Sequence, residues 1–71
     1  MTPIEKASKL ISYYLPFCND NLTDAKYCAI IAVDEIISEL AYTQNYLEDA
    51  MNKIQIYISY WQEVKQEIET I

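Results

Sequence analysis

The chain has 71 residues, of which 52% are hydrophobic, and its eleven acidic and five basic residues give a formal net charge of −6. This length allows one small domain, and the apolar content excludes a disordered, charge-dominated segment. The acidic balance and the lack of arginine argue against a surface that binds duplex nucleic acid, and an anionic membrane would repel the chain for the same reason.

Residues that are absent also limit the chemistry that we expect. Without histidine the commonest general base near neutral pH is missing, and without glycine there is no phosphate-cradling loop or nucleophile elbow. We therefore expect neither catalysis nor a cofactor. Two cysteines, Cys18 and Cys28, are too few for a structural zinc site, and we expect both as reduced thiols in a cytosol. A chain without glycine must also use Asn or Asp where a turn needs positive φ, which favours helices over tight β-hairpins.

The N-terminal segment predicts a helix over residues 3–15. Thr2 is suited to cap it, Pro3 to occupy its first position, and Glu5 to complete a capping box. Pro16 should end the helix within the two residues before it. Apolar residues recur at helical spacing on one face of this segment: Ile4, Ala7, Leu10, Ile11, Tyr14 and Leu15.

After a polar connector, the sequence predicts a second helix over residues 22–42. Either Asn21 or Thr23 can cap it, and Asp24 in its first turn suits the helix dipole. Cys28 lies among its apolar residues and is expected in the core, whereas Cys18 in the connector is expected to be more exposed. The helical pattern weakens at 43–45, where we predict a turn or a bend. The apolar face comprises Tyr27, Ile30, Val33 (or Asp34), Ile37, Leu40 and Ala41.

The third segment, residues 46–70, contains two competing periods. Residues 54–60 alternate as a half-buried strand would, but the alternation fails after Tyr60. A helical seam with alternating steps of four and three covers a longer stretch: Ala50, Ile54, Tyr57, Trp61, Val64, Ile68 and Ile71. The longer pattern predicts a helix. Further apolar residues then project beside this seam, and we predict a protein interface formed by Ile56, Ile58, Tyr60 and Trp61.

The expected fold is therefore all-α, a short N-terminal helix followed by an antiparallel hairpin of two longer helices in one domain spanning 1–71. A chain this small buries a modest share of its surface. Seven tyrosines and one tryptophan supply more amphipathic aromatic surface than its core needs. We therefore expect a homo-oligomer.

One cluster of residues suggests a ligand. Tyr13 and Tyr14 end the first predicted helix, and the start of the second follows closely in the chain. The N–H groups of that first turn and the cation of Lys26 attract phosphate, and a tyrosine ring can stack on a base. Asp24 in the same turn opposes an anionic ligand. The structural alternative is that the tyrosine packs on the hairpin while Lys26 is solvated.

Two blocks carry a family resemblance, DAKYCAIIAVDEIISEL at 24–40 and YWQEVKQEIETI at 60–71. Together they resemble a family of very small proteins encoded by bacteriophages of Bacteroidetes hosts. The family joins two such blocks by a variable connector, and it has no settled function. The resemblance implies a phage origin, and therefore a location in the cytoplasm of the infected bacterial host.

A looser similarity is to the helical hairpin domain of phage proteins that sequester immune signalling nucleotides. Pro16, Thr23 and Lys26 occupy comparable places, although this chain has no arginine and shares no diagnostic motif with those proteins. The similarity implies that Tyr13 or Tyr14 stacks on a base and that Lys26 meets a phosphate, with Thr23 beside them. It suggests a non-catalytic, oligomeric counter-defence protein that binds a cyclic or ADP-ribose-type nucleotide.

The acidic residues suggest a different function. Carboxylates at helical spacing imitate a phosphate backbone. The alternative hypothesis is therefore an acidic inhibitor of a host defence protein. A small phage assembly component is a third possibility. The pairs Glu35/Glu39 and Glu63/Glu67 are one helical turn apart, and we interpret them as solvated helix faces rather than metal ligands. No metal site is expected.

Overall fold

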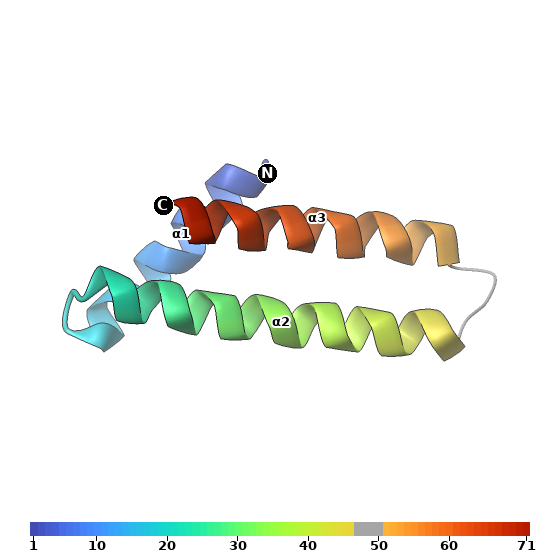
Figure 1. Cartoon of the computed structure of the whole chain (residues 1–71), viewed down its shortest axis with the longest axis horizontal. Coiled ribbons are helices and arrows are strands. Elements are labelled where there is room, and N and C mark those ends of the chain that lie inside the picture. Colours follow the sequence, from blue (N-terminus) through green and yellow to red (C-terminus); the bar gives the residue numbers. More distant parts are fainter. Residues whose placement is uncertain (47–50) are drawn as a thin grey trace.

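The computed structural model describes residues 1–46 and 51–71, and within these ranges the chain is helical, with no strand. The α-helices are α1 (Pro3–Tyr14), α2 (Leu22–Tyr46) and α3 (Met51–Thr70), and the 3₁₀-helix η1 (Leu15–Cys18) lies between α1 and α2. Helices α2 and α3 lie side by side and antiparallel, and α1 crosses them at one end (Figure 1). The predicted all-α class is confirmed, and so is a helix rather than a strand at 54–60. The predicted seam position Ala50 lies outside the described residues.

The start of α1 is the predicted capping box. The Thr2 hydroxyl accepts a hydrogen bond from the Glu5 N–H at 3.3 Å, and the Glu5 carboxylate accepts one from the Thr2 N–H at 3.0 Å. The hydrogen bond from the Thr2 N–H, followed by one that the Thr2 hydroxyl donates to the same carboxylate at 2.8 Å, lowers the pKa of Glu5. At its other end α1 stops at Tyr14, and the chain tightens into η1 around Pro16. The reversal that follows uses Asn19 at φ 54° and Asp20 at φ 58°, as expected for a turn without glycine.

Helix α2 begins with Asn21 as its cap, since the Asp24 N–H donates to Asn21 Oδ1 at 3.1 Å. Thr23, the alternative cap, therefore lies inside the first turn. The predicted turn at 43–45 is wrong, because the helix continues to Tyr46. Thr43 is accommodated in it by donating its hydroxyl to the Glu39 carbonyl oxygen one turn earlier, at 2.9 Å.

Helix α3 presents a different stripe to the hairpin from the one the heptad spacing predicts. Ile54, Val64 and Ile68 are buried as expected, but Tyr57 is 59% exposed and Ile58 only 5% exposed. The prediction that Ile58 projects beside the seam and joins an interface is therefore wrong. An α-helix drifts by about 20° per heptad relative to a strict seven-residue repeat, so the stripe passes from Ile54 to Ile58 by a step of four. Because Ile58 and not Tyr57 is buried, the Tyr57 ring lies at the surface, where its hydroxyl has access to water.

The core lies where all three helices meet. Its members are Ala7 and Ile11 of α1, Ala25, Ala29 and Val33 of α2, and Val64 and Ile68 of α3. An ion pair between Lys65 Nζ and Asp34 Oδ1, at 3.0 Å, joins α2 to α3 beside this core. The Asp34 carboxylate raises the pKa of Lys65. Both blocks that carry the family resemblance, 24–40 and 60–71, contribute to this cluster, so they have a packing role in this fold.

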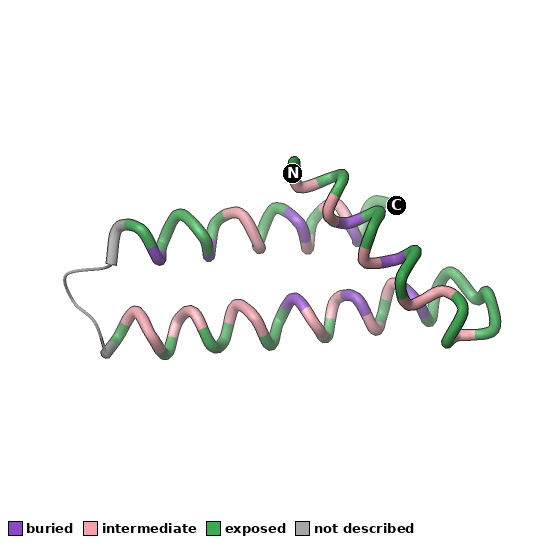
Figure 2. Tube along the Cα trace, turned by 180° about the vertical axis from the view of Figure 1, so that it is seen from behind, coloured by how far each residue is buried: buried purple, intermediate pink, exposed green. Residues whose placement is uncertain are grey.

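Helix α1 is too short to cover the whole hairpin. It has 12 residues against 20 in α3, and the chain measures 43 × 19 × 15 Å. The buried positions of α2 therefore gather near the α1 end, as Figure 2 shows, and the outer part of the hairpin is two helices thick. Among the helices described, none has the length and apolar character needed to cross a bilayer.

Candidate functional site

A hollow of about 260 Å³ lies between the start of α2 and the end of α3. Two of the predicted ligand residues, Thr23 and Lys26, line it together. They share one side of α2 because residues three positions apart lie on the same helix face. Their neighbours in the hollow are Tyr27 and Ile30 of α2 and Glu69 of α3.

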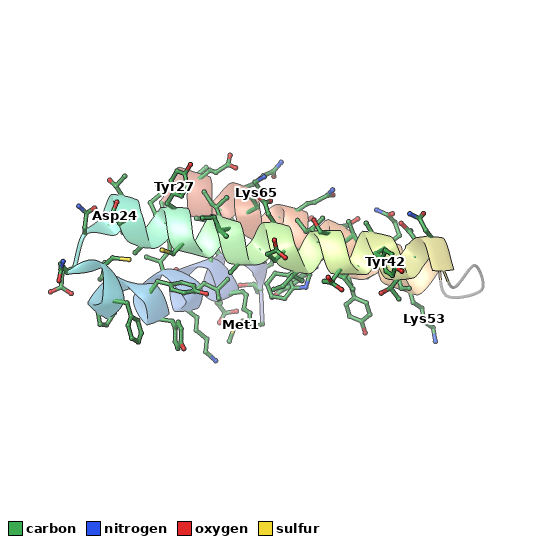
Figure 3. The ribbon with its side chains drawn as sticks, turned by 90° about the horizontal axis from the view of Figure 1, so that it is seen from below. Met1, Asp24, Tyr27, Tyr42, Lys53 and Lys65 are labelled. Carbon is green, nitrogen blue, oxygen red and sulfur yellow. The ribbon has the colours of Figure 1, made fainter. Side chains whose placement is uncertain are left out.

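The structure does not bring Tyr13 and Tyr14 to this hollow. Tyr14 is half-buried and packs against the core, and the two rings meet edge to face with centroids 5.2 Å apart. Tyr13 is 63% exposed and also contacts Phe17, at 5.9 Å between ring centroids. Tyr27 points away from α1, on the opposite side of α2 (Figure 3). The two predicted tyrosines therefore belong to a different face from Lys26.

Tyr27 is an aromatic residue of the hollow that the sequence pattern does not predict there. Its spacing from Ile30 and Val33 predicted it on the apolar face of the second helix, but it is 68% exposed. The available signal was local, since Tyr27 follows Lys26 directly and lies one turn after Thr23. An exposed ring beside a lysine and a hydroxyl is the combination that the ligand hypothesis requires.

Glu69 reaches the hollow because of the hairpin. It belongs to the last turn of α3, and the antiparallel arrangement brings that turn beside the first turns of α2. The hollow thus combines one cationic group, Lys26, with one anionic group, Glu69. Such a pair suits a ligand that carries both a negative charge and hydroxyl groups, because the carboxylate accepts hydrogen bonds and the ammonium donates them.

The residues predicted to form a protein interface have separate roles in the structure. Ile56 is 68% exposed. Tyr60 and Trp61 are half-buried and connect α3 to α1 within the chain. The Tyr60 hydroxyl donates to the Met1 carbonyl oxygen at 3.0 Å, and Lys6 Nζ lies 5.6 Å from the centre of the Trp61 ring. Two residues of the predicted interface therefore make contacts within the same molecule, Tyr60 with Met1 and Trp61 with Lys6.

Ile56 and Tyr60 also line two open hollows beside the N-terminus. One, of about 460 Å³, includes Met1, Pro3 and Glu63, and the other, of about 560 Å³, includes Lys6, Tyr57 and Trp61. Apolar and aromatic residues line both hollows together with polar ones, Gln55, Ser59 and Glu63 in the first and Lys6 in the second. They lie on the side of α3 that faces away from α2.

The two cysteines lie together where η1 meets α2. Cys18 Sγ and Cys28 Sγ are 3.8 Å apart, and both residues are half-buried, so Cys28 is not fully enclosed in the core as predicted. Burial, followed by the hydrogen bond with the Cys28 thiol, raises the pKa of Cys18. A raised pKa keeps Cys18 in the unreactive thiol form at neutral pH.

We expect iodoacetamide to alkylate Cys18 more slowly in the folded protein than in the urea-unfolded chain at neutral pH. The thiolate is the nucleophile, so the folded rate should approach the unfolded rate only at higher pH. Mass spectrometry of the labelled residue as a function of pH measures this. Cys28→Ser should shift the profile part of the way back, because it removes the thiol neighbour and leaves the burial. Identical profiles for folded and unfolded chains would contradict the expectation.

Among the described residues, no three or more His, Cys, Asp or Glu side chains gather in an arrangement that holds a metal ion. Comparisons of the chain with protein-family models, with curated proteins and with solved structures found no match. The hollow beside Tyr27 is the feature of the chain that bears most directly on function.

Proposed function

We propose that this protein binds a nucleotide of the cyclic or ADP-ribose type in the hollow beside Tyr27, and that it sequesters such signalling nucleotides as a non-catalytic phage counter-defence protein. One observation carries the proposal. Thr23, Lys26, Tyr27 and Glu69 supply a hydroxyl, a cation, an aromatic ring and a carboxylate to a single hollow. These are the groups by which proteins contact the parts of a nucleotide.

Each side chain has a role in this proposal. The Tyr27 ring stacks on the base, the role that the sequence similarity implied for Tyr13 or Tyr14. Lys26 donates to a phosphate oxygen, and Thr23 adds a hydroxyl at the same end of α2. Glu69 accepts a hydrogen bond from a ribose hydroxyl, as acidic residues do in dinucleotide-binding folds. The carboxylate is then a ligand for the sugar, not merely a repulsive charge near the phosphate.

The size and charge of the hollow set expectations for affinity. Its volume of about 260 Å³ lies just below the usual range of roughly 300–1,000 Å³ for ligand pockets. It therefore takes the base and ribose of one nucleotide, and the phosphates extend toward solvent. The contact between the Lys26 ammonium and a phosphate is electrostatic, so added salt weakens this contact.

Isothermal titration calorimetry against a panel of cyclic nucleotides, cyclic dinucleotides and ADP-ribose compounds tests the proposal. We expect one member of the panel to bind the native protein and to raise its melting temperature. Tyr27→Ala should weaken binding about 10- to 100-fold, because base stacking on an aromatic ring is worth about 1–3 kcal/mol. Lys26→Gln should weaken it and remove the loss of affinity with salt that comes from the phosphate contact.

The chain offers matched controls for these variants. Tyr13→Ala removes an equally exposed ring from the other face, and Lys9→Gln removes an equal charge from α1, so both should bind like the native protein. Loss of binding in Tyr13→Ala but not in Tyr27→Ala would move the site to the face of α1. If the native protein binds no compound of the panel, the proposal is wrong.

The alternative, an inhibitor of a host protein, uses the acidic side of α2, where Glu35 and Glu39 are exposed one turn apart. Glu35→Lys combined with Glu39→Lys separates the two functions. The double variant should retain nucleotide binding if the hollow is the site, and it should lose a basic protein partner if the acidic face is the site.

A further inference from the structure

The outer face of α3 carries a short row of residues that we name the outer seam: Lys53, Ile56, Tyr60 and Glu63. Their spacings of three, four and three place them on one side of the helix. That side is opposite to the buried Ile58, and the open hollow of about 460 Å³ includes three of the four residues. Lys53, Ile56 and Glu63 are exposed, and Tyr60 is half-buried under Met1.

The outer seam is complementary to the outer seam of a second copy that runs in the opposite direction. Its spacing reads the same in both directions about residue 58, so a second α3 laid antiparallel repeats the pattern in register. Ile56 then faces the partner's Tyr60, and Lys53 faces the partner's Glu63. Two-fold symmetry produces each of these pairs twice. A parallel alignment would instead place Lys53 against the partner's Lys53, which is unfavourable.

We propose that two copies of this protein associate through the outer seam as an antiparallel α3–α3 pair. The central apolar layers are Ile56 against the partner's Tyr60, and an ion pair between Lys53 and the partner's Glu63 closes each end. The positions of Lys53 and Glu63 favour a second copy as the partner on this face. Two identical antiparallel helices bring these opposite charges together by symmetry, whereas an unrelated helix would need an acidic and a basic residue at the same two positions by coincidence. This inference is independent of the nucleotide hollow, which lies between the start of α2 and the end of α3.

The surface area of the chain is consistent with such a pair. The accessible surface is 5134 Å², whereas a compact monomer of 8.3 kDa exposes about 4,600 Å². A specific interface near the lower limit of about 1,000 Å² in total takes about 500 Å² from each copy. The association is therefore expected to be reversible and concentration-dependent. It also covers Ile56, whose side chain is 68% exposed in one copy.

A charge-swap experiment tests the register. Lys53→Glu places two carboxylates opposite each other at both ends of the pair, and Glu63→Lys places two ammonium groups there. Each variant alone should dissociate at least tenfold more readily than the native protein in sedimentation equilibrium. An equimolar mixture of the two variants restores opposite charges at both ends, so it should form a heterodimer of about native affinity and twice the 8.3 kDa chain mass.

Two further variants control for net charge. Lys9→Glu and Glu35→Lys make the same charge changes on exposed positions of α1 and α2, outside the outer seam, and should associate like the native protein. Circular dichroism verifies that all variants retain native helicity. A native protein that stays monomeric up to millimolar concentration, or a mixture that fails to recover association, overturns the proposal. Nucleotide binding by the monomeric Lys53→Glu chain should be unchanged, so failure of the dimer and failure of the ligand site are distinguishable.

Discussion

Replacing Ile58 by alanine is expected to lower the free energy of unfolding by about 2–4 kcal/mol, the usual cost of truncating a buried isoleucine. The same change at Ile56 should cost well under about 1 kcal/mol, because exposed apolar side chains gain little from folding. The two residues have the same chemistry and are two positions apart on one helix. They differ in burial, at 5% exposed for Ile58 and 68% for Ile56.

Urea denaturation followed by circular dichroism measures this difference. The protein should be dilute, so that association through the outer seam does not contribute to the stability of the native chain. Equal m-values for the two variants would show that the denatured states are comparable. A larger loss of unfolding free energy for Ile56→Ala than for Ile58→Ala would show that α3 buries its Ile56 side. That result would contradict both the orientation of α3 and the outer seam.

Ala29→Leu is expected to destabilise the protein by about 1–3 kcal/mol and to loosen α1 from the hairpin. Ala29 is fully buried in the cluster that also contains Ala7 and Ala25, where small side chains let α1 and α2 approach closely. A leucine adds three carbons to a packed site and forces the helices apart. Trp61 is half-buried under α1, so its fluorescence should shift to the red as water reaches the indole.

Ala41→Leu is the matched control for this variant. Ala41 is a half-buried residue in the C-terminal half of the same helix. That half of α2 forms the outer part of the hairpin, away from α1 (Figure 1). Leucine and alanine are both good helix formers, so the two variants differ mainly in the space around the side chain. Thermal melts and emission spectra of both variants are compared with the native protein. A native melting temperature and spectrum for Ala29→Leu would show that α1 is not packed on this site.

The sequence assigns to the candidate site two residues that line the hollow and two others that lie on a different face. Thr23 and Lys26 were predicted together and share the hollow, because spacing along one helix fixes which residues have a common face. Tyr13 and Tyr14 were assigned to the same site because they are close in the chain. The turn through η1 and the left-handed residues Asn19 and Asp20 directs α1 across the other side of the hairpin. The two tyrosines are therefore near Lys26 in the sequence but lie on a different face of the molecule.

The sequence by itself determined the elements whose causes are local. The capping box at Thr2 and Glu5, the reversal through Asn19 and Asp20, and the helical character of α3 all follow from hydrogen bonds and spacings within a few residues. Only the tertiary structure decided that Ile58 and not Tyr57 is buried, and that Glu69 lines the same hollow as Tyr27. The reason is that burial depends on the small rotation of one helix against another, which is set by packing between residues distant in sequence and which no local pattern encodes.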